Sequence, residues 1–194
     1  SESAATILQR SGVAQTRALA ALGPNTTYHT VTMQHREQSP DVTNTSEFAL
    51  PDDTTTDLVM TFDSAGMLDT FSQVVRGADG QIYQRGEWLA DHLVFTDVKS
   101  GAIQSQVPYS RFPATAIRDR LSKATTAAVT ALGPSATAKT ATIDGIATFV
   151  IETPGNRTYI DRNNYNLVRS EQLALDGHVT EYTMPLTVEV LPGA

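Results

Sequence analysis

The sequence of 194 residues contains no cysteine. This absence excludes a disulfide scaffold, a thiol nucleophile and a zinc site built from cysteine. No apolar run approaches the roughly 20 residues that an α-helix needs to cross a bilayer, so we expect no transmembrane helix. Basic residues are also few, because 14 Lys and Arg stand against 21 Asp and Glu for a net charge of -7. Binding to phosphate backbones needs clustered Lys and Arg, so we expect no nucleic-acid partner.

The motifs of common enzyme classes are absent as well. The sequence has no HExxH, GxSxG, Walker or GxGxxG motif. His29 and His35 share a face of one expected strand, but roughly 20 Å of strand separates them, which is too far for one metal ion. Asp161 begins like a calcium loop, yet the sixth and twelfth positions hold Asn166 and Gln172 in place of Gly and Glu. A hairpin turn explains that segment better. We therefore expect no catalytic residue, no metal site and no cofactor, and a protein that is not an enzyme.

The composition that remains is that of a folded, β-rich chain. Hydrophobic residues make up 40% and charged residues 18%, which is too apolar for a disordered protein. The length falls within the roughly 100–200 residues typical of one domain, so we expect a single domain over 1–194. Thr and Val are common, and their stiff side chains favour strands. The first residues carry no signal peptide, so an exported protein would have lost its signal from this sequence.

Two helices are expected. The first covers 4–22 and ends at Gly23-Pro24, because Gly accepts the left-handed cap and Pro cannot continue the helix. The second covers 113–132, starts at Pro113 and ends at Gly133-Pro134. Its apolar residues recur at steps of three and four, which predicts a buried stripe made of Ile117, Leu121, Ala124, Ala128 and Leu132.

The rest of the sequence is expected to form strands. A strand over 27–37 is followed by a long loop over 38–57, with a short strand at 46–50. From 57 the pattern predicts a meander, in which Asp79-Gly80 forms a type I′ hairpin before strands at 81–89 and 92–98. In the last third, turns at Asp144-Gly145, at 161–166 and at Asp176-Gly177 separate further strands.

Large apolar side chains alternate along the meander, and they are the candidate ligand-binding residues. These are Leu58, Met60, Phe62, Met67, Phe71, Ile82, Trp88, Leu93 and Phe95. Two slender, Ala-rich helices are not expected to fill the concave side of a large sheet, which would leave an apolar cavity for a lipid-like ligand. An ordinary filled core is the alternative interpretation of the same residues.

The order of these elements resembles that of the LolA-like superfamily, which comprises bacterial lipoprotein carriers and related cell-envelope lipoproteins. The resemblance covers about 4–190 and depends on an Asp-Gly hairpin before an aromatic strand (78–83). It continues with Asp144-Gly145, a strand ending in Asp (158–161), a strand carrying Arg and an acidic residue (167–171), and Asp176-Gly177. It implies an α+β fold, namely a curved antiparallel sheet, or half-open β-barrel, with two main helices covering its concave side.

The resemblance also implies a function in the bacterial cell envelope. We expect a non-enzymatic, monomeric carrier that holds the acyl chains of a lipid or lipidated protein between sheet and helices, with the 38–57 loop as a gate. Its location would be extracytoplasmic: periplasmic, or tethered to the outer face of the membrane through a lipidated Cys in a segment that has been removed. A membrane surface is a further expected partner. The alternative is a protein-interaction or regulatory envelope module with the same fold and no lipid cavity.

Overall fold

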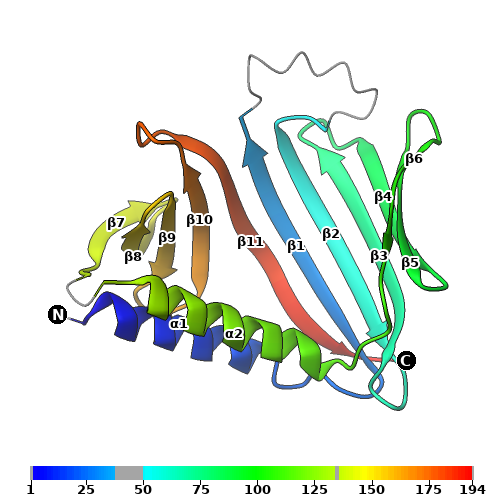
Figure 1. Cartoon of the computed structure of the whole chain (residues 1–194), viewed down its shortest axis with the longest axis horizontal. Coiled ribbons are helices and arrows are strands. Elements are labelled where there is room, and N and C mark those ends of the chain that lie inside the picture. Colours follow the sequence, from blue (N-terminus) through cyan, green and yellow to red (C-terminus); the bar gives the residue numbers. More distant parts are fainter. Residues whose placement is uncertain (1, 38–49, 134–135, 194) are drawn as a thin grey trace. The chain divides into compact units, whose positions relative to one another are not determined.

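The computed structural model describes residues 2–37, 50–133 and 136–193 and shows an antiparallel sheet with two helices (Figure 1). Its elements are α1 (Ala4–Ala18), β1 (Thr26–Arg36), β2 (Asp53–Phe62), β3 (Leu68–Gly77), β4 (Ile82–Leu89), β5 (His92–Asp97), β6 (Ile103–Pro108), α2 (Thr115–Ala131), β7 (Lys139–Ile143), β8 (Ile146–Thr153), β9 (Asn156–Asp161), β10 (Leu167–Leu173) and β11 (Val179–Pro192). The strand order is β6-β5-β4-β3-β2-β1-β11-β10-β9-β8-β7, so the sheet is open, with β6 and β7 at its edges. The predicted fold class is confirmed.

The chain divides into two compact units. Unit 1 comprises Ser1–Ala20 and Ala116–Pro185, and unit 2 comprises Ala21–Thr115 and Leu186–Ala194. Unit 1 therefore contains α1, nearly all of α2 and β7–β10, whereas unit 2 contains β1–β6 and the last part of β11. In the described residues, neither helix combines the length and the apolar character that a membrane span requires.

The first helix is shorter than the sequence predicts. Ser3 caps its N-terminus, because its hydroxyl accepts a hydrogen bond from the backbone N–H of Thr6 at 3.2 Å. The helix ends at Ala18, where the Leu19 N–H donates to the Thr16 carbonyl and tightens the last turn. The chain has thus left the helix before it reaches Gly23-Pro24, and the predicted end at 22 is wrong by four residues.

The core of unit 1 lies between α1 and the neighbouring strands β8 and β9. Ala4 and Ile7 of α1 are completely buried against Ile151 of β8 and Ile160 of β9. Leu8, Phe149 and Leu132 pack around this group. Apolar burial contributes about 25 cal/mol per Å², so this cluster is what holds α1 on its strands.

The second helix is buried much less than its pattern predicts. No residue of α2 is fully buried, and Ala124 and Ala128 of the predicted stripe are exposed, so the prediction of a buried stripe is wrong. The reason is that α2 turns Thr125, and not Ala124 or Ala128, toward α1. A Cβ added to Gly12 would lie only 2.6 Å from the Thr125 side chain, so the two helices approach closely there. Pro113 precedes the helix and forms an isolated bridge with Met67.

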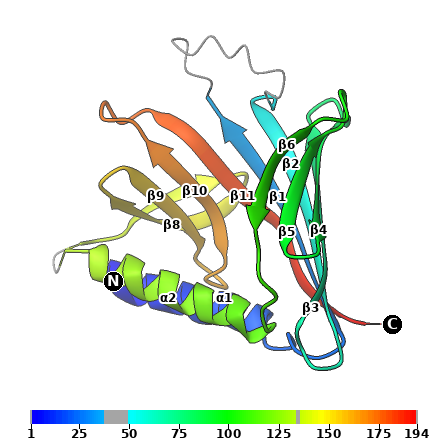
Figure 2. The ribbon, with the colours of Figure 1, turned by 45° about the vertical axis from the view of Figure 1, so that its right-hand side comes forward.

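Unit 2 is built from six strands in an antiparallel meander, which Figure 2 shows as consecutive neighbours. The strand predicted at 27–37 is present as β1. Residues 53–57 belong to β2, where the Thr-rich segment pairs with β1, so that part of the predicted loop is wrong. Residues 38–49, which carry the rest of the loop and most of the short strand at 46–50, lie outside the described residues. The sequence pattern also missed β6, which is mostly exposed and contains Pro108.

Two Asp-Gly pairs form different turns because their loops differ in length. Asp144 and Gly145 have φ angles of 49° and 80° and join the paired residues Ile143 and Ile146, as in a type I′ turn. At the other pair only Gly80 has a positive φ, of 77°, and its N–H donates to the Gly77 carbonyl. That loop of three residues suits a type I turn followed by a left-handed glycine, so the type I′ prediction for Asp79-Gly80 is wrong.

Candidate functional site

Strand register places six of the nine candidate residues on one face of unit 2. Met60 pairs with Phe71, and Trp88 pairs with Leu93. Paired residues of antiparallel strands point to the same side, and so do residues two apart on one strand. Gln73 lies two residues after Phe71 on β3 and pairs with Gly86 of β4. Gly86 in turn pairs with Phe95 of β5. We call this the apolar face, and its predicted members are Leu58, Met60, Phe71, Trp88, Leu93 and Phe95.

The other three candidates lie where the register is interrupted. Phe62 follows a register shift between Thr61 and Phe62 at the end of β2. Ile82 begins β4, beyond the shift between Val75 and Arg76 in the β3–β4 pairing. Met67 lies outside the named strands. The pairing therefore does not extend the apolar face to these three side chains.

The nine candidates differ in how much of their surface is free. Met60, Phe62, Phe71 and Leu93 are buried. Leu58, Met67, Ile82, Trp88 and Phe95 are half-buried. The first group forms core, and the second retains surface that a ligand can contact.

Two aromatic residues that the sequence pattern missed cover one end of the apolar face. The ring of Tyr109 lies 6.0 Å from that of Phe71, and the ring of Phe112 lies 6.2 Å from that of Phe62. Tyr109 and Phe112 also contact each other edge to face at 5.6 Å. The Trp88 indole N–H donates to the Tyr109 carbonyl at 3.0 Å. The segment after β6 thus supplies part of the cover, and no periodicity identified it because it belongs to no regular element.

Phe95 and Gly86 lie beside Gln73 at the centre of the face. Phe95 lies over Gly86, where an added Cβ would come within 2.7 Å of the phenyl ring. Tyr28 of β1 pairs with Met60 and therefore shares the face. Burial raises the pKa of the Tyr28 hydroxyl, because the phenolate form is poorly solvated there.

The apolar face continues from β1 to the end of β11. Glu189 hydrogen-bonds His29, so these two side chains lie on the same side of the sheet. Their neighbours Val188 and Tyr28 therefore lie on the other side, and so does Leu186 by alternation. Leu186 is 57% exposed and Val188 is 44% exposed. Apolar surface is thus available at this edge of the face.

The opposite face of unit 2 carries a histidine between two carboxylates. His29 Nδ1 lies 2.7 Å from Glu189 Oε1, and its Nε2 lies 2.9 Å from Asp57 Oδ1. The hydrogen bond to Glu189, together with Asp57, raises the pKa of His29. His35, His92 and His178 each contact one carboxylate, from Asp53, Asp91 and Asp176 respectively. In the described part of the chain, no three His, Asp or Glu residues are placed to hold a metal ion.

The segment that begins like a calcium loop is a turn between β9 and β10. Asp161 Oδ1 accepts a hydrogen bond from the Asn163 N–H at 2.7 Å, and Asn164 Oδ1 accepts one from the Asn166 N–H at 2.8 Å. Tyr165 adopts a positive φ of 61°. These side-chain oxygens stabilise the turn's own backbone, as the turn interpretation predicts.

Unit 1 has a buried ionic cluster on the strand face opposite α1. The Glu171 carboxylate is 4% exposed and is contacted by Arg169 Nη2 at 2.7 Å and by Arg157 Nη1 at 3.1 Å. The Tyr159 hydroxyl donates to the same carboxylate at 3.1 Å. The Arg169 guanidinium also lies 3.7 Å from the centre of the Tyr182 ring. Burial raises the pKa of Tyr159, which keeps its proton in place, so this arrangement suits structural neutralisation of charge better than acid–base chemistry.

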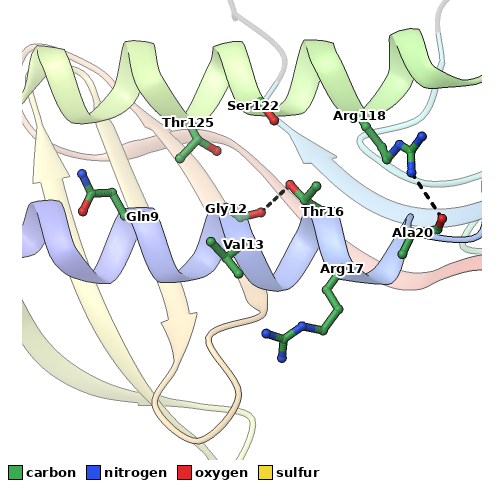
Figure 3. Close-up of a pocket in the computed structure, with 9 residues that line it drawn as sticks. All are labelled: Gln9, Gly12, Val13, Thr16, Arg17, Ala20, Arg118, Ser122 and Thr125. Atoms are coloured by element: carbon green, nitrogen blue, oxygen red, sulfur yellow. Dashed lines mark hydrogen bonds between the residues drawn. The ribbon is translucent and has the colours of Figure 1, made fainter.

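A groove of about 570 Å³ runs between α1 and α2 (Figure 3). It is lined by Gln9, Gly12, Val13, Thr16, Arg17, Ala20, Arg118, Ser122 and Thr125. Figure 3 shows Arg118 reaching the end of α1, where its Nη1 donates to the Ala20 carbonyl at 3.2 Å. The sequence pattern did not identify this groove, because it depends on how two separate helices pair.

No protein-family model and no curated protein matches this sequence. Among solved structures, the chain is similar to a chain of the Pseudomonas aeruginosa MucA/MucB complex, with 12% identity and a TM-score of 0.40. The match covers 98% of this chain but only 58% of the other. An uncharacterized conserved protein from Thermus thermophilus is similar at 9% identity and a TM-score of 0.41, covering 96% of this chain and 85% of the other.

A LolA superfamily protein from Nitrosomonas europaea is a third neighbour, with 9% identity and a TM-score of 0.34, covering 100% of this chain and 95% of the other. These likenesses concern the fold alone. What the chain binds has to be inferred from its own residues.

Proposed function

We propose that this protein is a non-enzymatic carrier that binds the acyl chain of a lipid or lipidated protein on the apolar face of unit 2. The observation that carries the proposal is the register, which collects Leu58, Trp88 and Phe95 on one face while leaving each side chain half-buried. An acyl chain is the simplest ligand for such a surface, because it needs contact area and no polar partner.

The energetics are favourable for a long chain. Each methylene moved from water into an apolar environment contributes about 0.8 kcal/mol. Ten methylenes would thus contribute about 8 kcal/mol, which leaves useful affinity after the costs of immobilising the chain. The exposed Leu186 and Val188 add contact surface of the same kind.

A location in the bacterial cell envelope is part of the proposal. Its support is the resemblance of the hairpin and strand motifs to the LolA-like superfamily, described above. A role for 38–57 as a gate remains a prediction, since residues 38–49 lie outside the described part.

The only tryptophan of the chain is itself a member of the apolar face, which provides a direct test. Stearic acid brominated along its chain should quench Trp88 fluorescence in a saturable manner, because bromine quenches an indole at close range. Unbrominated stearic acid should compete and restore the signal. If no quenching occurs with protein stripped of bound lipid by organic extraction and refolding, the proposal is wrong.

Adjacent residues of β2 provide a matched pair of variants. Leu58 and Val59 are both half-buried, but they point to opposite faces. Leu58→Asn should raise the ligand concentration needed for half-maximal quenching by about tenfold, since it removes most of one apolar contact. Val59→Asn should leave quenching unchanged. Equal effects of the two variants, with thermal unfolding as the check on folding, would argue that ligand does not contact this face.

A protein-binding module is the second candidate function. Its support is exposed apolar surface on β11 in unit 2, where Leu186 and Val188 are each more than 40% exposed. Such patches commonly mark contacts with partners. Under this alternative Leu186→Asp would abolish capture of a protein partner from envelope extracts, while brominated stearic acid would leave Trp88 fluorescence unchanged.

A further inference from the structure

Positive charge is concentrated on the two helices of an acidic protein. The helices hold five of the 14 basic residues and one of the 21 acidic residues. They therefore carry four net positive charges, while the remainder of the chain carries eleven negative ones. The basic residues are Arg10 and Arg17 on α1 and Arg118, Arg120 and Lys123 on α2, and Asp119 is the acidic one.

Most of these cations are available to an external partner. Arg10 is engaged, because it forms an ion pair with Glu2 and donates to the Tyr165 hydroxyl. Within the described ranges, no hydrogen bond or ion pair is found for the exposed side chains of Arg17, Arg120 and Lys123. Arg118 uses one nitrogen on the Ala20 carbonyl and keeps others free.

The groove between the helices lies among these charges. Arg17 lines it from α1 and Arg118 from α2, and no acidic residue lines it. Val13, which is 56% exposed, adds an apolar patch to the α1 side. Figure 1 and Figure 2 both show α1 and α2 side by side, so basic, polar and apolar groups are presented together along the helix pair.

We propose that the exposed face of the α1–α2 pair docks on an anionic phospholipid surface, with a headgroup phosphate entering the groove near Arg17 and Arg118. Charge complementarity is the argument for a bilayer as the partner. Clustered basic residues on an amphipathic surface bind anionic bilayers, and each basic residue near the membrane surface adds to the binding free energy. An extended bilayer suits these residues better than an acidic peptide, because Lys123 does not line the groove and extends the charge along α2. Arg120 stands two positions after Arg118 and therefore points away from the groove side of the helix. Arginine in the groove can bind phosphate through two nitrogens.

This inference rests on unit 1 alone and does not require the apolar face of unit 2 to bind an acyl chain. It gives the helix pair a task that the carrier proposal leaves open, namely orienting an acidic protein toward a surface of the same charge sign. The two proposals can therefore fail separately.

Sedimentation with vesicles tests the docking surface. The full chain should co-sediment with phosphatidylcholine vesicles that contain phosphatidylglycerol, but not with pure phosphatidylcholine vesicles, and added salt should release it. Arg17→Gln, Arg118→Gln and Lys123→Gln should each lower the partition coefficient by up to about fivefold. Arg120→Gln should have a smaller effect, because Arg120 lies on the far side of α2 from the groove. The matched controls are Arg76→Gln and Arg85→Gln, which remove exposed charges from β3 and β4 of unit 2 and should have little effect.

Three outcomes would overturn the proposal. One is the absence of binding to phosphatidylglycerol vesicles at low salt. Another is an equal loss with the helix variants and the unit 2 controls, which would indicate diffuse electrostatics without a docking face. The third is helix-dependent binding of a polyglutamate peptide without vesicle binding, which would assign the surface to an acidic protein segment. Circular dichroism of each variant confirms folding, and Trp88 quenching by brominated stearic acid reports separately on the carrier proposal.

Discussion

Unit 1 and unit 2 are both built from antiparallel strands, yet they treat their apolar faces differently. In unit 1 a helix covers the strands, and Ile7, Ile151 and Ile160 are at most 3% exposed. In unit 2 the described cover is a short segment after β6, and Leu58, Trp88 and Phe95 stay half-buried. Met60, Phe71 and Leu93 on the same face are buried, so the face of unit 2 is only partly covered. The comparison separates apolar residues that hold the fold together from apolar residues that keep surface for a ligand.

The polar groups of the two units differ in the same way. Unit 1 buries an ionic cluster around Glu171, where two arginines and a tyrosine contact one carboxylate, although the buried Arg169 Nε has no hydrogen-bond partner among the described residues. The His29 group of unit 2 links three strands, but its carboxylates are more than 40% exposed. Removing one partner of a buried ion pair strongly destabilises the fold, whereas an exposed ion pair contributes little to stability. The two units should therefore respond differently to comparable substitutions.

The largest difference is expected from truncating one apolar residue in each unit. Ile160→Ala should lower the free energy of unfolding by about 2–5 kcal/mol, because it leaves a cavity in a closed core. Leu58→Ala should lower it by only about 1 kcal/mol, since that side chain is only partly buried. Urea denaturation followed by circular dichroism measures both. Equal losses would mean that the apolar face of unit 2 is as closely packed as the core of unit 1.

An intermediate effect is expected from the ionic cluster. Glu171→Gln should cost about 2–3 kcal/mol of unfolding free energy, because it removes the buried charge that both guanidiniums contact, while Arg157 retains Glu152. Glu152→Gln is the matched control at the exposed end of the same cluster, where Lys139 and Arg157 are its partners, and should cost less than about 1 kcal/mol. A cost for Glu152→Gln that equals that of Glu171→Gln would contradict the assignment of the stability to burial.

The smallest effect is expected from His29, and it depends on pH. Because the pKa of His29 is raised in the folded state, its stabilising contribution is present below the unfolded value of about 6.5 and is lost as pH rises through the folded value. His29→Gln should thus lower the unfolding free energy by less than about 1 kcal/mol at pH 5.5 to 6 and by less still at pH 9. His92→Gln, with Asp91 81% exposed, serves as the control. If the loss of unfolding free energy caused by His29→Gln grew with pH, it would contradict a raised pKa of His29 in the folded state.

Much of the fold could be predicted because strand alternation and turn residues are local signals. The segments that became β1, β4 and β5 were identified to within a residue or so at each end, and six of nine candidate residues fall on one face. The errors arose where a partner far along the chain decides the outcome. Ala124 and Ala128 have helical periodicity but lack a buried position, because α2 turns Thr125 toward Gly12 of α1. Tyr109 and Phe112 follow no periodicity, so their contacts with Phe71 and Phe62 could not be predicted.

The sequence by itself determined the alternation that makes one face of β2 to β5 apolar, and it determined the excess of cations on the helices. Both are properties of residue order, since side-chain direction in a strand or helix repeats with a known period. Only the tertiary structure decided which apolar residues are covered and which retain surface, and it alone created the groove between α1 and α2. Coverage depends on contacts between segments distant in the chain, such as Gly12 with Thr125, and no local period encodes those.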